Sequence, residues 1–584
     1  MARVFYNGDF IYVETSRLDI NKLKELAKEY SAQYSEEYNM YAFPKKMKCV
    51  LDISELKGGI FDKSFEDLAE KVKSVIKRRE EEKQAEIDAL NLPECMYPFQ
   101  KEAVAQMLKM QRNILLASEQ GCGKTCMSSV YLNKSNNYPA LIVCPASLKT
   151  NWAVEIHKWT PNIKTYIISG RDSYENRYVI ESAKQADVII INYDILGIDD
   201  KEAQKREKER IKIAKENGWK YRKAFIPVKG WVDVFNSEFE LKCLCLDECQ
   251  YIESEKAIRT RAVIQIAVNE RIKKLFCSGT PFETRVAQFY VACHLLAPDL
   301  FPKEWDFKQR YCNPYYNGFG WTYKGVSNLE ELRSLLSSFM IRHKKEDVLK
   351  QLPPKQKIPI YFDMDKNARK IYDQMEEELA EQEDSIHQFA YLAKMKEALV
   401  DIKIEPVIQF IKDMLEVEDK VVVFTFHDRM FQEIMGTFGK QAVGINGSTP
   451  SEKRQTYVDA FQNDENVRIF VGQIKAASAG ITLTASRTVI FTEWGQTPAQ
   501  HNQATDRIHR IGQEADRCLI YYLIIKDTVD EDPLTNLSEH NADIEAVMDG
   551  NTNAKFVDFD SLMIAKVKER RLMNKKKSVQ IEYD

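Results

Sequence analysis

The chain has 584 residues, which is too long for one hydrophobic core and indicates several domains. Hydrophobic residues make up 44% and charged residues 29%, values that exclude a mostly disordered, collagen-like or fibrous chain. The 84 basic and 88 acidic residues leave a net charge of -4, so local basic patches must hold any polyanionic partner.

No apolar run reaches the roughly 18 residues that a bilayer-spanning helix needs. The opening sequence MARVFYNGDFIYVE lacks the basic and apolar regions of a secretory signal. The 12 cysteines include no C-x-x-C pair, and we expect them to be buried free thiols. These features predict no membrane partner. They favour a cytoplasmic, nucleoid-associated protein of a bacterial or phage-infected cell, or a nuclear protein if the source is eukaryotic.

Residues 1–90 are predicted to form an N-terminal accessory module of small α+β type. The segment FYNGDFIYVE (5–14) is typical of a β-hairpin, with its turn at the Asn-Gly or Gly-Asp pair. Residues 18–34 have the pattern of a helix, and KCVLDISEL (48–56) is predicted to be a strand.

Beyond this module, short apolar segments alternate with longer amphipathic segments, which indicates an α/β fold with parallel sheets flanked by helices. The strands fall into two series of five, which predicts two consecutive lobes at residues 91–345 and 405–538. The first series is NILLA (113–117), ALIVC (140–144), DVIIIN (187–192), LCLD (244–247) and KLFCSG (274–279), and the second is VVVFTF (421–426), AVGIN (442–446), RIFVGQ (468–473), TVIFTE (488–493) and IYYLI (520–524).

Three charged segments lie outside these series. Residues 361–400 are almost free of glycine and proline, so a helical linker or protrusion is predicted over 346–404. Residues 201–223, with ten basic residues against four glutamates, are predicted to be an inserted helix. Residues 539–584 are predicted to form a basic C-terminal tail. Each basic segment is interpreted either as a solvated surface or as a contact to a phosphate backbone.

A phosphate-binding loop is predicted where the strand 113–117 runs into Gly121-Cys122-Gly123-Lys124-Thr125 before a helical segment. Two glycines allow backbone N–H groups to surround a phosphate at the helix N-terminus. Lys124 would then reach the β- and γ-phosphates of ATP, and the Thr125 hydroxyl would bind Mg²⁺. Ser118 occupies the position at which the strict motif has its first glycine.

An acidic pair and two arginines complete the predicted catalytic set. Asp247 and Glu248 follow a buried strand, where Asp247 would hold Mg²⁺ and Glu248 would deprotonate the attacking water. Arg507 and Arg510 are predicted to share one helical face, one turn after Gln503, and to stabilise the charge of phosphoryl transfer from the second lobe.

In chain order, these segments resemble the motifs of the Swi/Snf-type ATPases, a branch of the superfamily-two helicase-like translocases. The resemblance covers residues 93–535. The segments 320–329 and 340–355 are most similar to the annealing-helicase, fork-remodelling branch. The similar segments are YPFQKEAV (97–104), ASEQGCGKT (117–125), LIVCPASLKTNW (141–152), INYDIL (191–196), DECQ (247–250), SGTPF (278–282), VVVFTFH (421–427), INGSTPSEKR (445–454), ASAGITLTAS (477–486), QATDRIHRIGQ (503–513) and DTVDE (527–531).

The resemblance implies two tandem RecA-like lobes with ATP in the cleft between them. Gln100 would read the adenine, and Gln503 and Gly480 would also contact the nucleotide. The implied partner is double-stranded, forked or branched DNA, bound by a monomer that could work with replication or recombination proteins. The implied strand contacts are Ser147, Lys149, Asn151, Ser478, Thr482, Thr484 and Trp494, with Gly480 beside them; for Trp494, core packing is an equal alternative.

The sequence departs from the family pattern at three places. Besides Ser118, the pair Cys249-Gln250 replaces the usual small residue and histidine, and Thr505 replaces an acidic residue. The catalytic side chains are all retained. The open point is the coupling between the DECQ and SGTPF segments.

The predicted function is ATP-dependent translocation on double-stranded DNA, used to remodel forks, anneal strands or migrate branches. Three alternatives stay open. They are displacement of DNA-bound proteins such as nucleosomes or RNA polymerase, an RNA helicase, and a DNA-binding scaffold whose ATPase has lapsed. The N-terminal module is predicted to recognise DNA structure, because residues 36–56 faintly resemble the substrate-recognition domain of annealing helicases.

Overall fold

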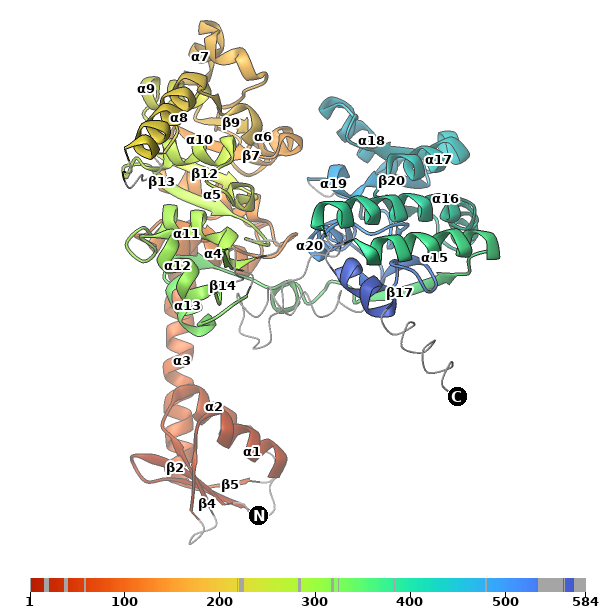
Figure 1. Ribbon diagram of the computed structural model, residues 1–584. Helices are drawn as coiled ribbons and strands as arrows, with labels where there is room; N and C mark the ends of the chain where they lie inside the picture. Colours follow the sequence, from red (N-terminus) through yellow and green to blue (C-terminus); the bar gives the residue numbers. More distant parts are fainter. Residues whose placement is uncertain are drawn as a thin grey trace. The chain divides into compact units, whose positions relative to one another are not determined.

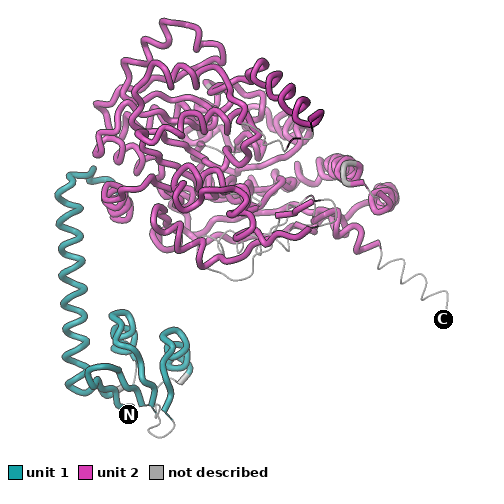
Figure 2. The backbone as a smooth tube through the Cα atoms, turned by 60° about the vertical axis from the view of Figure 1, so that its left-hand side comes forward, with its two compact units in different colours: residues 1–96 teal, residues 97–584 magenta. Residues whose placement is uncertain are grey.

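The computed structural model divides the chain into two compact units, residues 1–96 and 97–584 (Figure 2). It describes residues 2–14, 20–35, 40–56, 59–217, 219, 225–281, 285–316, 320–323, 325–382, 384–477, 480–533, 560 and 562–571. In this part of the chain no helix is long and apolar enough to span a membrane.

The N-terminal unit is an α+β module, as predicted, built on a five-stranded sheet in the order β3-β4-β2-β1-β5. The hairpin is confirmed, because β1 and β2 pair antiparallel with Val4 opposite Val13. Its core is a single apolar cluster that includes Val4, Ile11, Phe43 and Phe65. Its elements are β1 (Ala2–Tyr6), β2 (Phe10–Glu14), α1 (Ile20–Glu29), β3 (Gln33–Ser35), β4 (Met40–Pro44), α2 (Met47–Ser54), β5 (Gly59–Phe61) and α3 (Lys63–Ala89).

The strand predicted over 48–56 is wrong, since this segment forms the helix α2. Cys49, Val50 and Ile53 are its buried residues, and the spacing of one and four positions places them on one helical face. The 27-residue helix α3 was not predicted. Its polar second half has no strong apolar periodicity, and buried residues gather near its start, at Phe65–Val72.

The first lobe contains a parallel seven-stranded sheet in the order β16-β6-β13-β12-β7-β9-β8. All five predicted strands are confirmed. The two additional ones are short strands at the sheet edges. The strands are β6 (Ile114–Leu116), β7 (Ala140–Cys144), β8 (Thr165–Ile167), β9 (Val188–Asn192), β12 (Cys243–Asp247), β13 (Lys273–Cys277) and β16 (Met340–Ile341).

Helices flank this sheet, as expected for parallel strands whose faces must both be covered (Figure 1). Buried strand residues such as Leu141, Ile189 and Leu244 share one apolar cluster with helical residues such as Trp231 and Ile266. The helices are α4 (Pro98–Lys109), α5 (Lys124–Ser135), α6 (Lys149–Trp159), α7 (Arg177–Lys184), α9 (Trp231–Glu238), α10 (Ile258–Ala267), α11 (Tyr290–Leu296), α12 (Glu304–Tyr311) and α13 (Leu329–Leu336).

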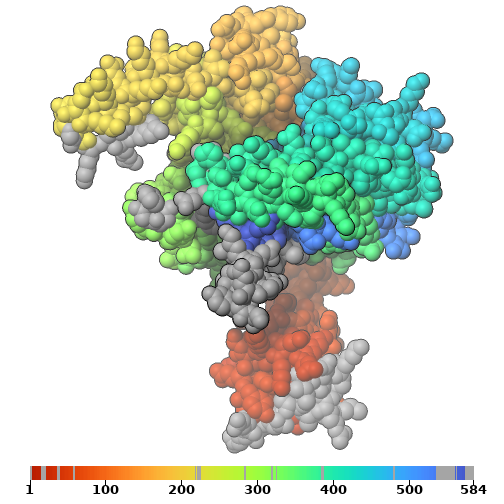
Figure 3. Space-filling model, turned by 45° about the vertical axis from the view of Figure 1, so that its right-hand side comes forward, coloured from red at the N-terminus to blue at the C-terminus, as the bar shows by residue number. Residues whose placement is uncertain are grey.

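The basic segment after β9 contains the predicted inserted helix. This helix, α8 (Lys201–Glu216), projects from the first lobe as the yellow arm of Figure 3. Short antiparallel strands β10 (Ile198–Asp199) and β11 (Val228–Lys229) close the base of the insertion. A second small hairpin, β14 (Tyr315–Tyr316) and β15 (Trp321–Thr322), follows α12.

The second lobe contains a parallel six-stranded sheet in the order β17-β22-β21-β18-β20-β19. Its five predicted strands are confirmed. The sixth strand, β17, lies in the segment predicted to be a helical linker. The elements are β17 (Lys355–Phe362), β18 (Val421–Thr425), α17 (Asp428–Phe438), β19 (Ala442–Ile445), α18 (Ser451–Asn463), β20 (Ile469–Gln473), α19 (Ile474–Ala477), β21 (Thr488–Phe491), α20 (Pro498–Thr505) and β22 (Cys518–Ile525).

Two long helices follow β17, α15 (Lys366–Glu381) and α16 (Ser385–Val417), and they cover the face of the second lobe seen in Figure 3. The short α14 (Lys345–Val348) precedes β17. The fold class is therefore confirmed as α/β, with two parallel sheets and a small N-terminal α+β module.

A helix over residues 562–571 packs on the second lobe, in the region predicted to be a basic tail. Met563 and Val567 are buried in the apolar core of this lobe. Arg570 pairs with Asp532 at 2.6 Å and with Glu376 at 3.0 Å. Arg570 therefore neutralises acidic groups of the protein itself. The rest of the predicted tail lies outside the described residues, apart from Asp560.

Candidate nucleotide site between the two lobes

The loop between β6 and α5 has the conformation that a phosphate loop requires. Gly121 and Gly123 have φ angles of +86° and +83°, a region that side chains rarely adopt. A Cβ atom at Gly123 would lie 2.4 Å from Nε2 of Gln100. Burial raises the pKa of the Cys122 thiol to about 11, so this side chain is a neutral part of the loop. Lys124 and Thr125 begin α5 at the end of this turn.

Lys124 lies across the loop. Its ammonium donates hydrogen bonds to the carbonyl oxygens of Ser118, at 3.1 Å, and Glu119, at 3.5 Å. A bound phosphate would offer this ammonium a charged acceptor in place of two neutral ones.

Gln100 contacts the loop from α4. Its Oε1 accepts from the backbone N–H of Tyr97, and its Nε2 donates to the carbonyl of Cys122 at 3.0 Å. The side chain is buried, with 3% exposed. Both ends of the amide are therefore bonded to protein atoms, and the structure gives Gln100 a role in supporting the phosphate loop. Its contact with an adenine ring stays a prediction.

The acidic pair lies at the carboxyl end of β12, beside the phosphate loop. Asp247 accepts from the Trp152 indole N–H at 2.7 Å and from the Glu248 backbone N–H at 3.0 Å. Burial and the neighbouring charge of Glu248 raise the pKa of Asp247 to about 6. Glu248 has a φ of +53°, which turns the chain sharply after the strand.

A chain of hydrogen bonds connects this pair to the SGTPF segment. Gln250 donates from Nε2 to Glu248 at 2.8 Å, and its Oε1 accepts from the Ser278 hydroxyl at 2.7 Å. The amide supplies both a donor and an acceptor, so it can bridge two groups with one side chain. Gln250 thus provides a direct connection at the point where the sequence departs from the family pattern.

The arginines of the second lobe reach the same place. Arg507 donates from Nη2 to Oε1 of Gln120 at 2.7 Å, and Arg510 donates from Nη1 to the Thr482 hydroxyl at 2.8 Å. Burial, together with the charge of Arg510, lowers the pKa of Arg507 to about 10. Burial also lowers the pKa of Arg510.

The predicted helix around these arginines ends too early to carry them, because α20 ends at Thr505. Arg507 and Arg510 stand in the turn that follows. Gln503 lies on α20, where its backbone carbonyl accepts from Nε of Arg507 at 2.9 Å. Turn geometry rather than a shared helical face therefore directs both guanidinium groups toward the phosphate loop.

One cavity brings the predicted catalytic groups together. Its volume is about 160 Å³. This is below the roughly 300–1,000 Å³ typical of small-molecule sites, so a nucleotide would have to displace side chains such as Lys124. It is lined by Gln120, Gly121, Gly123, Lys124, Thr125, Cys126, Leu148, Asn151, Glu155, Asp247, Glu248, Gly480, Thr482, Arg507 and Arg510.

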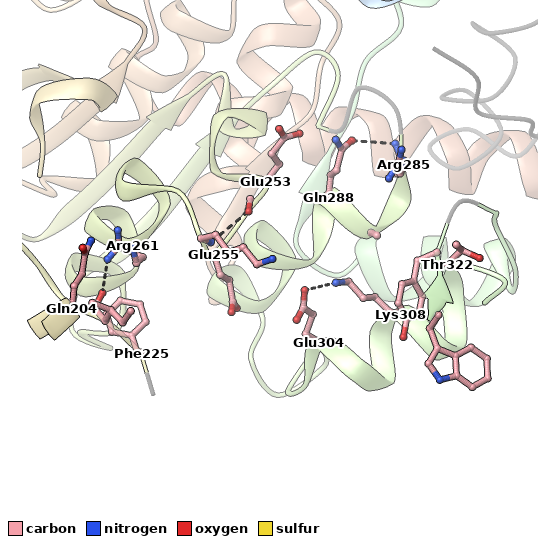
Figure 4. Close-up of a pocket in the computed structure, with 16 residues that line it drawn as sticks. Gln204, Phe225, Glu253, Glu255, Arg261, Arg285, Gln288, Glu304, Lys308 and Thr322 are labelled. Atoms are coloured by element: carbon pink, nitrogen blue, oxygen red, sulfur yellow. Dashed lines mark hydrogen bonds and ion pairs between the residues drawn. The ribbon is translucent and has the colours of Figure 1, made fainter. Parts of the chain in front are cut away.

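A larger cavity of about 990 Å³ lies elsewhere on the first lobe (Figure 4). Two of its cations are already paired, Lys308 with Glu304 at 2.5 Å and Arg261 with Asp199 at 2.6 Å. It contains none of the predicted catalytic residues. Chemistry and not size therefore identifies the smaller cavity as the candidate site.

The predicted strand contacts divide into three groups. Asn151 and Thr482 line the candidate nucleotide cavity, so the structure favours a nucleotide-side role for both. Ser147 is half-buried, Lys149 donates to the Ile168 carbonyl at 3.0 Å, and Thr484 accepts from Gln462 at 3.2 Å. For these three, contact with a strand stays a prediction. Ser478 lies outside the described residues.

Trp494 has a packing role. Its ring is 4% exposed and stacks on Tyr522 with the ring centroids 5.0 Å apart. Its indole N–H donates to the Asp530 carbonyl at 2.8 Å. Because the ring is stacked and its N–H is bonded, the structure favours core packing for Trp494, and contact with DNA stays a prediction.

The sequence interpretation missed three residues of the site. Gln120 holds Arg507, Gln250 connects Glu248 to Ser278, and Trp152 orients Asp247. Trp152 is a buried core residue, and its N–H also fixes the carboxylate. Amide side chains carry no charge and no nucleophile, so the only signal for the two glutamines was their position inside a motif.

Comparison with known families identifies the family of this chain. The family model for the SNF2-related domain matches residues 99–415, and that for the helicase conserved C-terminal domain matches residues 402–512. The chain belongs to the SNF2-related family. The predicted family resemblance is thereby confirmed. Each lobe of this SNF2-related protein is built on one of the two parallel sheets described above.

Two curated relatives share about three-quarters of the chain. The SWI/SNF-related matrix-associated actin-dependent regulator of chromatin subfamily A-like protein 1 of Xenopus laevis is 31% identical over 75% of this chain and 42% of its own length. The human DNA annealing helicase and endonuclease ZRANB3 is 30% identical over 74% of this chain and 39% of its own length. The SNF2-related chain thus spans about two-fifths of these relatives.

A solved structure, the Sulfolobus solfataricus SWI2/SNF2 ATPase core in complex with dsDNA, is 22% identical. The match covers 79% of this chain and 94% of that chain, with a TM-score of 0.35. The two-lobed architecture follows from the strand order of the two sheets and not from this likeness.

Proposed function

We propose that this SNF2-related protein hydrolyses ATP between its two lobes in order to translocate on double-stranded DNA, and that it remodels forks, anneals strands or migrates branches. One observation supports the ATPase most directly. Lys124, Asp247 and Glu248 of the first lobe line a single cavity with Arg507 and Arg510 of the second. These are the groups that phosphoryl transfer needs, and they come from both lobes.

The phosphate end of ATP would bind at the loop that contains Gly121 and Gly123. Lys124 would exchange its two carbonyl acceptors for phosphate oxygens. Glu248 would take a proton from the attacking water, and the amides of Gln250 and Gln120 hold its carboxylate at 2.8 and 3.4 Å. Arg507 and Arg510 would stabilise the charge that develops on the transferred group.

The acidic pair fits a magnesium ion. Asp247 and Glu248 are adjacent carboxylates, and the pKa of Asp247 is raised by burial and by the charge of Glu248. A divalent cation would relieve both effects. The Thr125 hydroxyl lines the same cavity. Among the described residues no group of three or more His, Cys, Asp or Glu could hold a metal. This agrees with magnesium, which commonly takes one or two carboxylates and substrate phosphates.

Movement on DNA would follow from the way in which the nucleotide joins the lobes. A ligand that contacts both lobes favours their closed arrangement, and loss of the γ-phosphate removes part of that preference. Ser147, Lys149 and Thr484 are proposed to contact the strand. Their polar groups suit phosphate contacts, which position a strand without reading its bases. The human relative is named a DNA annealing helicase, which supports DNA as the partner.

Steady-state ATP hydrolysis by the purified protein tests this function, measured alone and with single-stranded, duplex and forked DNA and with RNA. We expect duplex or forked DNA to stimulate turnover most. The preferred DNA structure would then distinguish fork remodelling from plain duplex tracking. Stimulation by RNA alone would support the RNA helicase instead. Hydrolysis under none of these conditions would support the scaffold with a lapsed ATPase.

A further inference from the structure

The segment 340–355 lies beside the phosphate loop. The pairing of β16 with β6 continues past the ends of both strands. The backbone N–H groups of Ala117 and Glu119 donate to the carbonyls of Ile341 and His343 at 2.8 and 3.0 Å. The Ser118 hydroxyl is hydrogen-bonded to His343 Nδ1 at 2.9 Å. The first part of the segment is therefore fixed to the first lobe.

Lys345 is the point at which the segment passes to the second lobe. Its backbone N–H donates to the Glu119 carboxylate at 2.8 Å. Its ammonium lies 2.7 Å from the Asp506 carboxylate and donates to the His509 carbonyl at 3.1 Å. A Cβ atom at Gly121 would lie 3.1 Å from Cε of Lys345. One buried side chain thus touches the phosphate loop and two residues of the turn that contains Arg507.

A second lysine holds the same carboxylate. Lys355 lies 2.9 Å from Asp506, and the imidazole Nε2 of His509 donates to the Pro353 carbonyl at 2.8 Å. Burial alone would raise the pKa of Asp506, but the two ammonium groups hold it well below its ordinary value. Asp506 therefore remains charged. The turn that contains Arg507 and Arg510 is held in place by the contacts of Asp506 and His509.

We propose that Lys345 is a positioning residue that aligns the arginine turn of the second lobe with the phosphate loop of the first. The inference rests on the proposed ATPase function. Lys345 is not among the residues that line the candidate nucleotide cavity, so it would act through the arginine turn. It holds Asp506 and His509, so that Arg507 and Arg510 point into the cavity when the phosphate loop is filled. Removing its charge should therefore impair the chemical step more than nucleotide binding.

The test compares Lys345→Met, which keeps the length and removes the charge, with Lys345→Arg, which keeps the charge. Lys350→Met is the matched control, because Lys350 is an exposed lysine of the same segment. For each variant we would measure kcat and KM for ATP with duplex DNA, and the Kd of a fluorescent ATP analogue. We expect Lys345→Met to lower kcat by about tenfold or more and to change Kd by less than about threefold. Lys345→Arg should recover most of kcat.

A second measurement does not depend on a destabilised variant. Burial lowers the pKa of Lys345 to about 8; the charge of Asp506 and the Cys122 thiol oppose this shift, and the charge of Lys355 adds to it. Two more charged residues lie near this side chain. Glu119 accepts from the backbone N–H of Lys345, and Arg510 lies beside Gly121, as Lys345 does. Turnover should fall above about pH 8 as this ammonium loses its proton. The decline should move to higher pH in Lys345→Arg, because a guanidinium stays protonated.

The outcomes separate this proposal from the ATPase itself. No hydrolysis by the unchanged protein would remove the proposed function. Normal hydrolysis with an unchanged kcat in Lys345→Met, or the same alkaline decline in Lys345→Arg, would overturn the role of Lys345. A parallel loss of kcat and of nucleotide affinity would also overturn it, because Lys345 would then belong to the binding site.

Discussion

Arg507 of the second lobe donates a hydrogen bond from Nη2 to Oε1 of Gln120 at 2.7 Å, although the two residues are 387 positions apart in the chain. Gln120 lies in the phosphate loop and also donates to Glu248 at 3.4 Å. A single neutral amide therefore contacts both the arginine of one lobe and the acidic residue of the other. The neutral amide bridges a positive group and a negative group and neutralises neither of them.

This relationship predicts that Gln120→Leu, which keeps a large apolar side chain but removes the amide, will lower kcat by about tenfold at unchanged KM. The reason is that Arg507 loses the acceptor that aims it. The double variant Gln120→Leu/Arg507→Ala should be scarcely slower than Arg507→Ala, since both changes remove one arrangement. Fully multiplicative losses in this cycle would show that Gln120 acts independently of Arg507.

Loss of the catalytic groups should abolish turnover while DNA binding persists. Glu248→Gln removes the proposed base, a change that typically costs about 10²–10⁴ in rate. Lys124→Ala should abolish productive nucleotide binding. Fluorescence anisotropy with duplex DNA should give an unchanged Kd for both. Lys134→Ala is the control, because Lys134 is exposed near the end of α5, the helix that begins at Lys124. A Glu248→Gln variant with full DNA-stimulated hydrolysis would refute the role of this residue.

The bridge through Gln250 should couple ATP hydrolysis to DNA. Gln250→Leu disconnects Glu248 from Ser278, and we expect it to retain basal hydrolysis but to lose most of the stimulation by duplex DNA. Ser278→Ala removes the other end of the same bridge and should have the same effect. The ratio of stimulated to basal kcat is the measurement. If the ratio stayed normal in both variants, the bridge would be structural only.

Gly123 should not tolerate a side chain. Alanine there would combine a φ of +83° with a Cβ atom 2.4 Å from Gln100 Nε2, so Gly123→Ala should weaken binding of a fluorescent ATP analogue by about tenfold or more. Gly436→Ala is the control, because Gly436 lies within α17 and a Cβ there meets nothing within 4 Å. That variant should be more stable by about 0.4–1 kcal/mol. Equal nucleotide affinity in the two variants would contradict the loop assignment.

Features that depend on residues close together in the chain were predictable from the sequence, and features that depend on distant residues were not. The ten predicted strands are buried apolar runs, such as VIIIN at 188–192, and were found. β17 was missed because it is an edge strand, five of whose eight residues are exposed. Lys124, Asp247 and the arginines were recognisable by residue type and spacing. Gln120, Gln250 and Lys345 were not, because each has a partner in another segment, Arg507, Ser278 and Asp506 respectively, and only the tertiary fold brings these pairs together.

Trp494 provides the last test, because two interpretations of this residue predict different results. If it packs the core, as its 4% exposure and its hydrogen bond to Asp530 indicate, Trp494→Phe should lower the free energy of unfolding by about 1–3 kcal/mol. The Kd for duplex DNA should then stay unchanged. Urea unfolding and anisotropy on the same preparation measure both quantities. Tyr361→Phe, at a partly exposed ring of the same lobe, serves as a control that should change neither. Unaltered stability with a weaker DNA Kd would restore the strand contact, because a buried ring cannot lose its packing without a cost in stability.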